Sequence, residues 1–204
     1  MSKTYLFRIT HIENIPHILR YGITHSKSPD ANPHFIPIGD TGLISTRGKF
    51  KLTNGRLLGE YIPFYFGTRT PMLYVIQNGY NMVNPTPVGN IVYCVSTVEK
   101  IVELNLDFIF TDGHALDSFS NQYDQSEIAN IDNLIDKQAI KAKYWRDEAD
   151  LDLKRRKEAE FLIFGDIAPS AVLGFIVYDQ TAFDRLISFG IEKAKLQIKP
   201  EFYF

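Results

Sequence analysis

Two glutamates, Glu158 and Glu160, stand directly before the apolar run Phe161-Leu162-Ile163-Phe164. Such a run is typical of a buried strand, which would hold the carboxylate at its start in a fixed position behind a charged, mobile segment. A charged turn that leads into an ordinary core strand gives the same pattern. Together with Arg8 and Arg47, the glutamates predict a cleft for a phosphorylated, ribose-bearing molecule, because the planar guanidinium of arginine pairs with phosphate oxygens.

A cluster of aromatic residues follows Arg47 in the chain: Tyr61, Phe64, Tyr65 and Phe66. Their ring faces could hold a flat heterocycle, although core packing is the more common use of such a cluster. A carboxylate that accepts a hydrogen bond from a ribose hydroxyl can stabilise the oxocarbenium-like centre that forms as a glycosidic bond breaks. These residue types suffice to cleave NAD+ at its nicotinamide bond. They would serve equally in a protein that binds a nucleotide without chemistry.

The motifs do not support other kinds of site. No glycine-rich loop ends in Lys-Ser or Lys-Thr, and no Gly-x-Gly-x-x-Gly follows a strand, which argues against the usual nucleotide-binding folds. The histidines form no His-Glu-x-x-His motif, and Cys94 is the only cysteine, so we expect no metal site and no internal disulfide. Cys94 lies in an apolar run and is predicted to be a buried thiol. No Gly-x-Ser-x-Gly motif indicates a serine nucleophile.

The composition predicts one globular domain over residues 1–204. The chain has 204 residues, of which 45% are hydrophobic, enough for one core and too few for two comfortable domains. Its net charge of −2 predicts no general attraction to nucleic acid, so any such contact must come from a local basic patch. The chain shows no apolar segment typical of a signal peptide or a membrane span, and we expect a cytoplasmic protein.

The elements that must position these residues mix strands and helices. We predict strands at 4–10, 91–95, 108–110, 161–164, 175–178 and 194–198, and helices at 12–22, 98–104, 134–144 and 181–189. Residues 61–66 resume regular structure, and residues 72–76 fit either a strand or the start of a buried helix. Residues 24–60 form a long irregular stretch, which in compact domains is usually functional or disordered. Without a regular β-α-β alternation, the order favours an α+β fold with a largely antiparallel sheet.

Several motifs make the chain resemble the DarT family, the toxins of bacterial toxin–antitoxin systems that ADP-ribosylate bases of single-stranded DNA. The resemblance runs essentially from end to end. Its markers are Ile9-Thr10-His11-Ile12-Glu13-Asn14, Ile18-Leu19-Arg20-Tyr21-Gly22, Tyr61-Ile62-Pro63-Phe64-Tyr65-Phe66, Arg69-Thr70-Pro71-Met72-Leu73-Tyr74, Phe110-Thr111-Asp112 and Lys157-Glu158-Ala159-Glu160-Phe161-Leu162. The most specific of these markers is the combination of Pro63-Phe64-Tyr65-Phe66 with Pro71-Met72-Leu73-Tyr74.

The resemblance implies an ADP-ribosyltransferase fold with a split, largely antiparallel sheet, NAD+ as co-substrate and a base of single-stranded DNA as acceptor. It implies that Glu160 and Arg47 are catalytic. Residues 30–58 would cover NAD+, and residues 112–160 would form the substrate-recognition loop. The residues expected to contact NAD+ are Arg8, Ile9, Thr10, His17, Arg47 and Tyr65.

The resemblance also implies partners. A macrodomain antitoxin of the DarG type is expected, and the protein is expected to act as a monomer. The residues expected to contact DNA are His114, Tyr144, Trp145, Lys154, Arg155 and Arg156. This stretch concentrates positive charge in a slightly acidic chain, although Asp147, Glu148, Asp150 and Asp152 lie among these cations and could neutralise them.

The chain departs from the family pattern at two places. Arg8 stands where many members carry histidine, and the sequence around Arg47 is less rich in arginine. Glu158-Ala159-Glu160 also resembles the two-glutamate signature of arginine-modifying transferases. An ADP-ribosyltransferase for protein or RNA is therefore an alternative, and a noncatalytic module that binds NAD+ or nucleic acid is a third. The modified base, thymine or guanine, stays open.

Overall fold

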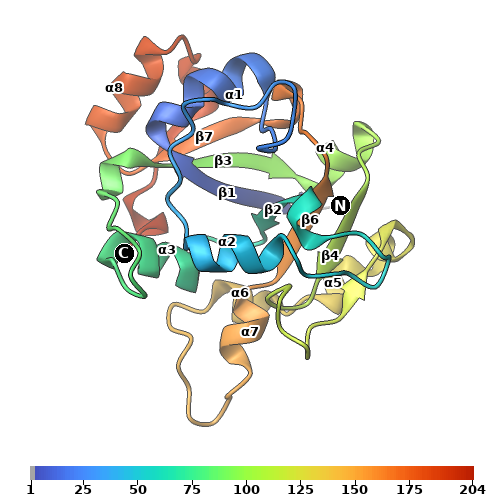
Figure 1. Cartoon of the computed structure of the whole chain (residues 1–204). Helices are drawn as coiled ribbons and strands as arrows, with labels where there is room; N and C mark the ends of the chain where they lie inside the picture. The colour runs from blue at the N-terminus through green and yellow to red at the C-terminus, as the bar shows by residue number, and fades with distance from the viewer. Residues whose placement is uncertain (1–2) are drawn as a thin grey trace.

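The computed structural model describes residues 3–204, which form one eight-stranded sheet with helices packed against it (Figure 1). The order along the sheet is β5-β4-β6-β2-β1-β3-β7-β8. Every pairing is antiparallel except that of β7 with β8, which confirms the predicted α+β fold with a largely antiparallel sheet. The strands are β1 (Tyr5–His11), β2 (Tyr61–Tyr65), β3 (Ile91–Thr97), β4 (Phe108–Thr111), β5 (Gln122–Tyr123), β6 (Glu160–Phe164), β7 (Gly174–Val177) and β8 (Leu196–Ile198).

The helices are short. They are α1 (Ile15–Tyr21), α2 (Thr41–Arg47), α3 (Pro71–Asn78), α4 (Val98–Glu103), α5 (Ile131–Leu134), α6 (Lys137–Lys141), α7 (Leu153–Lys157) and α8 (Gln180–Ser188). Helices α1 and α8 lie at the top of the view in Figure 1, and α6 and α7 lie at the bottom. Within residues 3–204, no helix has the length and apolar character needed to cross a membrane.

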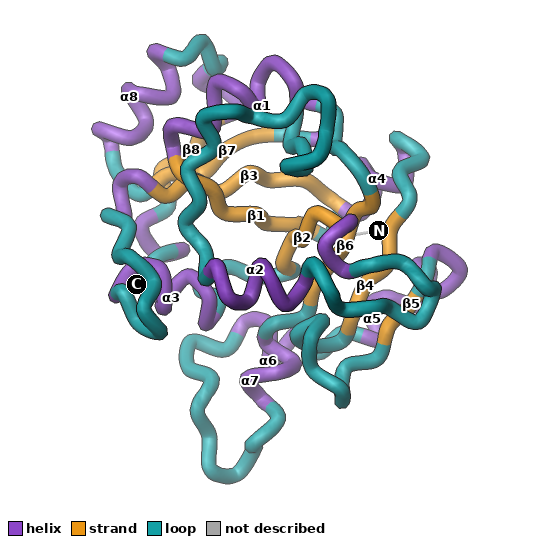
Figure 2. Tube along the Cα trace, viewed as in Figure 1, coloured by secondary structure: helices purple, strands orange, loops and turns teal. Residues whose placement is uncertain are grey.

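The sheet is split between β1 and β2. These two neighbours share a single paired position, Phe7 with Tyr65. By contrast, β1 pairs with β3 from Tyr5–Thr97 to His11–Ile91, and β2 pairs with β6 over its whole length. Two half-sheets therefore diverge from one point of contact (Figure 2). The split that the sequence resemblance implied is present.

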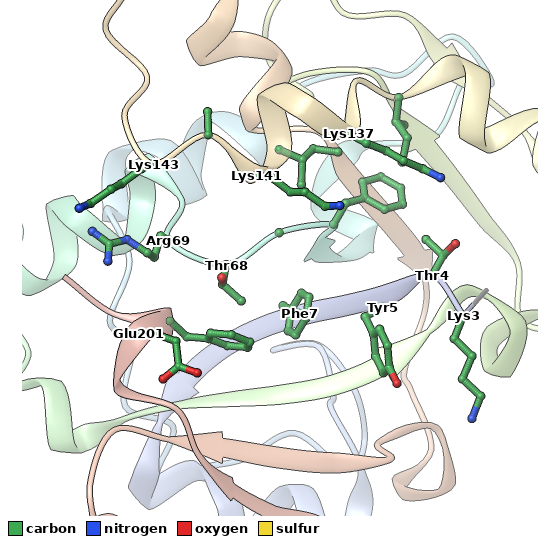
Figure 3. Close-up of a pocket in the computed structure, with 16 residues that line it drawn as sticks. Lys3, Thr4, Tyr5, Phe7, Thr68, Arg69, Lys137, Lys141, Lys143 and Glu201 are labelled. Carbon is green, nitrogen blue, oxygen red and sulfur yellow. The ribbon is translucent and has the colours of Figure 1, made fainter.

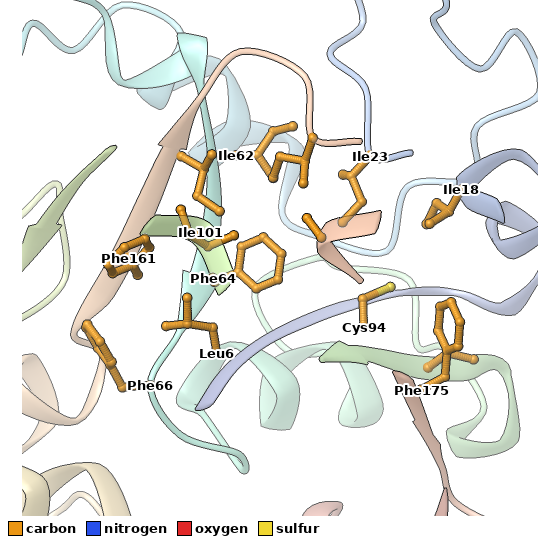
Figure 4. Close-up of a cluster of buried hydrophobic side chains, with 14 of the residues drawn as sticks. Leu6, Ile18, Ile23, Ile62, Phe64, Phe66, Cys94, Ile101, Phe161 and Phe175 are labelled. Carbon is orange, nitrogen blue, oxygen red and sulfur yellow. The ribbon is translucent and has the colours of Figure 1, made fainter. Parts of the chain in front are cut away.

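Burial follows the alternation of side chains along the strands. On β1, Leu6 packs into the main core, whereas Phe7 and Ile9 pack against a second cluster that contains residues of α3 and the C-terminal Tyr203. The main core lies against α1, α4 and α8 (Figure 4). Cys94 is fully buried there, as predicted, and burial raises the pKa of its thiol to about 12. The thiol is therefore not a nucleophile near neutral pH.

Capping side chains decide where the helices begin. Residues 72–76 lie in α3 because Thr70 caps its start, accepting a hydrogen bond from the backbone N–H of Leu73 at 3.3 Å, and Pro71 is its first residue. Gly79, at φ 71°, ends that helix in the left-handed conformation. The other predicted strands and helices are confirmed to within a few residues, with one exception.

The helix predicted over 134–144 is present but shorter, as α6. The carboxylate of Asp136 accepts hydrogen bonds from the backbone N–H groups of Gln138 and Ala139, both at 2.9 Å, so a new helix starts there and α5 and α6 are separate. The irregular stretch 24–60 also contains a helix, α2, which Asp40 caps. No residue of α2 is buried, so no apolar periodicity marks it in the sequence.

Candidate active site

Glu160 is the first residue of β6 and is completely buried. One of its carboxylate oxygens, Oε1, accepts hydrogen bonds from the backbone N–H of Ala115 at 2.9 Å and from Nη1 of Arg47 at 3.2 Å. The other, Oε2, lies 2.8 Å from Nη2 of Arg47, in an ion pair whose angles do not satisfy a hydrogen bond. The structure thus brings together the two residues predicted to be catalytic.

Thr111, at the end of β4, holds the backbone around this carboxylate. Its buried hydroxyl accepts a hydrogen bond from the backbone N–H of Glu160 at 3.2 Å and donates to the carbonyl of Gly113 at 2.6 Å. These bonds turn the chain after β4 so that Ala115 points its N–H at Glu160. The carboxylate is therefore fixed by a main-chain N–H of the turn after β4, in addition to the arginine.

Opposing effects set the charge of Glu160. Burial alone would raise the pKa of its carboxyl, but the positive charge of Arg47, that of His114, and the hydrogen bonds from Arg47 and Ala115 hold that pKa below its usual value. Burial likewise disfavours the charged form of Arg47. The negative charge of Glu160 and its hydrogen bond outweigh this effect, so the pKa of Arg47 is raised. Both groups are charged at neutral pH, in a site where water screens them little.

Arg47 lies on a surface segment. It ends α2, and its side chain is the part of that helix that turns inward, with 14% of its area exposed. The chain after it is anchored by Leu52 and Leu58, which are buried in a third cluster against β6 and β4. Gly48 and Gly59 pack backbone to backbone, since a Cβ on Gly59 would lie 2.7 Å from Cα of Gly48.

Arg8 and Thr10 lie where the sheet splits. Nη1 of Arg8 donates to the carbonyl of Pro63 at 3.0 Å and so bridges β1 and β2 beyond their last paired position. Burial lowers the pKa of Arg8, and the nearby charge of Arg47 lowers it further. Thr10 is 5% exposed, and its hydroxyl accepts a hydrogen bond from Nδ2 of Asn14 at 3.0 Å.

The other residues predicted to contact NAD+ differ in their surroundings. Tyr65 pairs with Glu160 across the sheet, and burial, reinforced by the charge of Glu160, raises the pKa of its hydroxyl, which stays protonated. Ile9 packs against the second cluster with Phe7. His17 packs against Tyr21 within α1 in a tilted arrangement, at 4.8 Å between ring centroids, and in the described part of the chain no contact joins it to Glu160.

His114 is the predicted DNA-contacting residue that lies nearest the carboxylate. Burial lowers the pKa of its imidazole, whereas the charge of Glu160 acts in the opposite direction. Its Nδ1 accepts a hydrogen bond from the backbone N–H of Leu116 at 3.2 Å, which orients the ring. Tyr144 is 70% exposed, whereas Trp145 packs edge-on against Tyr74 and anchors the loop before α7.

The cations of α7 differ from one another. Lys154 is exposed. Arg155 binds Asp152 through two hydrogen bonds of 2.7 and 2.8 Å and Asp112 through one of 2.9 Å. Arg156 pairs with Asp136, Asp150 and Asp152. Their contact with DNA stays a prediction, and the ion pairs give both arginines a structural role.

Asn14 is a residue of the site that the sequence analysis missed. It is buried, and besides Thr10 it contacts the backbone of Ile36 twice: Nδ2 donates to the carbonyl and Oδ1 accepts from the N–H, both at 2.9 Å. The segment that leads to α2 is thereby tied to the end of β1. An asparagine among the apolar residues of a predicted helix start was the signal available for it.

A split antiparallel sheet, with a buried glutamate at the start of a central strand paired to an arginine from the covering segment, is the arrangement of an ADP-ribosyltransferase. Residues 7–204 match the family described as "ssDNA thymidine ADP-ribosyltransferase, DarT". The chain is 32% identical over 197 residues to a DNA ADP-ribosyl transferase of Thermus sp. (strain 2.9), covering 92% of this chain and 90% of that protein. It is also 32% identical over 182 residues to one of Escherichia coli O127:H6, covering 88% and 82%. This chain belongs to the DarT family of NAD+-dependent DNA ADP-ribosyltransferases.

Solved structures agree with this assignment. The fold superposes on Thermus sp. 2.9 DarT in complex with ADP-ribosylated ssDNA with a TM-score of 0.84 and 28% identity, covering 98% of this chain and 96% of the other. The same protein in complex with NAD+ gives a TM-score of 0.78 at 29% identity, covering 100% and 99%. Thermosipho africanus DarTG in complex with ADP-ribose gives 0.80 at 26% identity, covering 98% of this chain and 51% of that protein.

Proposed function

We propose that this chain transfers the ADP-ribose of NAD+ to thymine in single-stranded DNA and releases nicotinamide, with Glu160 and Arg47 as its catalytic residues. The observation that carries the proposal is the buried pair of Arg47 and Glu160 beside the split of the sheet. The family description supports thymidine as the acceptor, and the complex of a relative with ADP-ribosylated ssDNA supports the strand state.

Glu160 supplies the electrostatic part of the chemistry. When the bond between ribose C1′ and the nicotinamide nitrogen breaks, its electron pair leaves with nicotinamide, and positive charge develops at C1′. A fixed carboxylate, held ionised in a site of low dielectric, stabilises that charge more strongly than water could. Because Ala115 and Arg47 already hold Glu160 in place, little reorganisation is needed as the charge appears.

The acceptor nitrogen must also lose a proton. Thymine within DNA carries one N–H, at N3, so a bond from that nitrogen to C1′ releases one proton. Two groups close to Glu160 are suited to take it near neutral pH. Burial raises the pKa of Glu158 to about 7, and burial lowers the pKa of His114. We propose that one of these two groups accepts the proton.

NAD+ is held between the half-sheets in this proposal. Arg8 and Arg47 supply guanidinium groups for the diphosphate, and Thr10, Ile9 and Tyr65 line the ribose and nicotinamide. The segment 30–58 covers the co-substrate, because Asn14 ties Ile36 to β1 and α2 carries Arg47 to Glu160. His17 borders this site from α1.

The segment 112–160 recognises the acceptor strand. It contains Ala115 and His114 at the carboxylate and exposed side chains such as Tyr144 and Lys154 farther out. A single strand is the fitting substrate, because a base paired within a duplex hides N3, and extruding that base costs a few kcal/mol.

We further propose that an ADP-ribosyl glycohydrolase of the DarG type opposes this activity. A relative from Thermosipho africanus, 30% identical over 183 residues, is a fusion of the transferase with a DNA ADP-ribosyl glycohydrolase, and this chain covers 44% of its length. We also propose that the protein works in the cytoplasm, where its DNA substrate lies, and that it acts as a monomer.

Mass spectrometry of acceptors incubated with NAD+ tests the function. Random single-stranded oligonucleotides, duplexes, RNA and a protein mixture are offered in parallel, with the Glu160→Gln variant as control. The expected result is one ADP-ribose added to thymine of the single strand by the unmodified chain alone. Labelled RNA or protein beside unlabelled DNA would instead establish the alternative acceptor.

A further inference from the structure

A basic groove of about 680 Å³ lies beyond the active site, at the end of β2 (Figure 3). One wall is formed by α6 and the residues that follow it, and the opposite wall by the start of β1. In Figure 3, Lys141 and Lys137 face Tyr5 and Phe7 across the groove, with Arg69 and Lys143 towards one end and Lys3 at the other. Neither the catalytic pair nor the residues predicted to contact NAD+ line it.

The groove carries an excess of positive charge that the protein does not neutralise. Its charged lining residues are Lys3, Arg69, Lys137, Lys141, Lys143 and Glu201. The one acid, Glu201, pairs with Lys199 outside the groove at 3.6 Å, and Lys137 pairs with Asp132 at 2.8 Å. Among the described residues, the remaining four cations form no ion pair. In a chain of net charge −2, this local excess points to an anionic ligand.

The floor of the groove offers ring faces. Tyr5 is 51% exposed at the start of β1 and stacks on Phe7 with 6.4 Å between centroids. Phe202 meets Phe7 edge-on at 5.9 Å and completes the floor. An exposed aromatic ring beside uncompensated cations is the combination that single-stranded nucleic acids use, because bases stack on the ring while phosphates meet the cations.

Arg69 is held in an unfavourable state at one end of the groove. Its φ of 52° lies in the left-handed region, and its buried Nε has no hydrogen-bond partner. Its guanidinium lies 4.4 Å over the ring of Phe204. Backbone strain and an unsatisfied buried donor are both retained mainly where a site requires them.

The groove begins where the chain leaves β2, next to the residue that pairs with Glu160. Its residues Phe66 and Gly67 directly follow Tyr65, the strand partner of Glu160. The wall is also fixed to the end of α7, just before the catalytic strand, because the buried Lys157 donates to the carbonyls of Ile140 and Ala142 at 3.1 and 2.6 Å. The groove is therefore a rigid, basic surface attached to the two strands that meet at Glu160.

We propose that this groove binds the part of the single-stranded DNA that flanks the modified base, and this inference rests on the proposed function. Lys141, Lys143 and Arg69 bind backbone phosphates, and a flanking base stacks on Tyr5. The strand thus leaves the active site along the end of α6, where Lys141 lacks a counter-ion, and not along α7, where aspartates pair with Arg155 and Arg156.

The test compares Lys141→Glu/Lys143→Glu with Lys193→Glu/Lys195→Glu, an equal charge change at exposed lysines outside the groove. Steady-state transfer is measured on a 20-nucleotide and on a 4-nucleotide single strand over a range of NaCl concentrations. For the groove variant we expect the KM for the long strand to rise at least tenfold, and the log–log salt slope to fall by about 1.4, since each lost phosphate contact removes about 0.7. Tyr5→Ala should raise the same KM about tenfold through lost stacking, without changing the slope.

The KM for NAD+ and the turnover of the 4-nucleotide strand should stay within twofold of the unmodified chain in every variant. Equal KM values for the long strand in the groove and control variants would overturn the groove assignment while leaving DNA transfer established. Absence of DNA modification by the unmodified chain would instead overturn the proposed function on which it rests.

Discussion

Arg47 and Arg155 are equally buried and play different parts. The side chain of Arg47 is 14% exposed and that of Arg155 is 13% exposed, and each is paired with a carboxylate brought from a distant part of the chain. Arg155 is saturated: it binds Asp152 with both oxygens, Asp112 and Ser120. Arg47 meets Glu160 alone, and Nη2 and Oε2 form no proper hydrogen bond.

The segments that carry the two arginines also differ in how tightly they are packed. Arg155 lies on α7 and packs so closely against Gly113 that a Cβ on this glycine would come within 2.7 Å of the arginine side chain. Arg47 lies on α2, a helix with no buried residue. Burial of an arginine therefore does not identify its role. An arginine with free hydrogen-bonding capacity on a lightly anchored segment can exchange its partner for a substrate, whereas a saturated one holds the fold.

Glu160→Gln should show the largest effect. Glutamine keeps the shape and can still accept from Ala115, but it removes the negative charge at the reacting centre, so transfer should fall at least a thousandfold, about 4 kcal/mol of barrier. Arg47 should turn towards solvent, and the Tm should change by only a few degrees. Activity within tenfold of the unmodified chain, in a variant with normal circular dichroism, would remove Glu160 from the catalytic role.

Arg47→Lys should reduce kcat about a hundredfold, because lysine keeps the charge and lacks the fork that reaches both Glu160 and a phosphate. Arg56→Lys, on the same segment but paired with Asp107, is the matched control and should have near-normal kcat. Single-turnover rates measured at saturating NAD+ check this. Near-normal rates for Arg47→Lys would reduce Arg47 to a general source of positive charge.

Arg155→Met should lower stability and leave the chemistry intact. The methionine leaves Asp112 without its cation, and Asp112 also holds Asn121 through hydrogen bonds of 2.9 and 2.7 Å. We expect a loss of about 2 kcal/mol in the free energy of unfolding, less than for a fully buried pair. Chemical denaturation measures it, with transfer assayed well below the Tm. A large loss of kcat without a loss of stability would show that Arg155 acts on a substrate.

Asn14→Ala should act on NAD+ through the covering segment. It removes two hydrogen bonds to the backbone of Ile36 and one to Thr10, so the segment that carries Arg47 loses its anchor. We expect the KM for NAD+ to rise about tenfold and limited proteolysis within 24–40 to become faster, at a cost of about 1–2 kcal/mol in stability. Unchanged proteolysis would show that other contacts fix the segment.

The smallest effect concerns the pH dependence of stability. Burial raises the pKa of Glu158 from 4.5 to about 7, so the folded state holds this proton more tightly than the unfolded chain does. Its contribution to stability is therefore greatest below about pH 4.5 and declines as the pH rises to about 7. Glu158→Gln stays neutral throughout, and its stability should decline less over this interval in urea unfolding series. Parallel pH curves for the two proteins would place Glu158 in contact with water.

Local patterns predicted much of this structure. The β-branched and aromatic residues of 4–10 and 161–164 specified strands, and the motifs placed Arg47 and Glu160 together before any geometry was known. Features without apolar periodicity could not be predicted in this way. Helix α2 buries no residue, and the carboxylate of Asp136 starts α6 later than the predicted helix. The sequence already places Asp152 three residues before Arg155, where the two can form an ion pair. The hydrogen bond of Arg155 to Asp112 spans 43 residues and depends on the tertiary fold.

The single paired position between β1 and β2 gives this sheet two edges in its interior. Outer edges invite a strand from another molecule and must be protected against it. Inner edges are flanked by the two half-sheets of the same molecule, yet their main-chain groups have no strand partner beyond the single paired position. Beyond Phe7, β1 has such an edge from Arg8 to His11. The side chain of Arg8 bridges the two strands only at the start of this edge, by its hydrogen bond to Pro63. A carboxamide carries the same donor and acceptor as a peptide bond, so this edge has the main-chain groups that would pair with one.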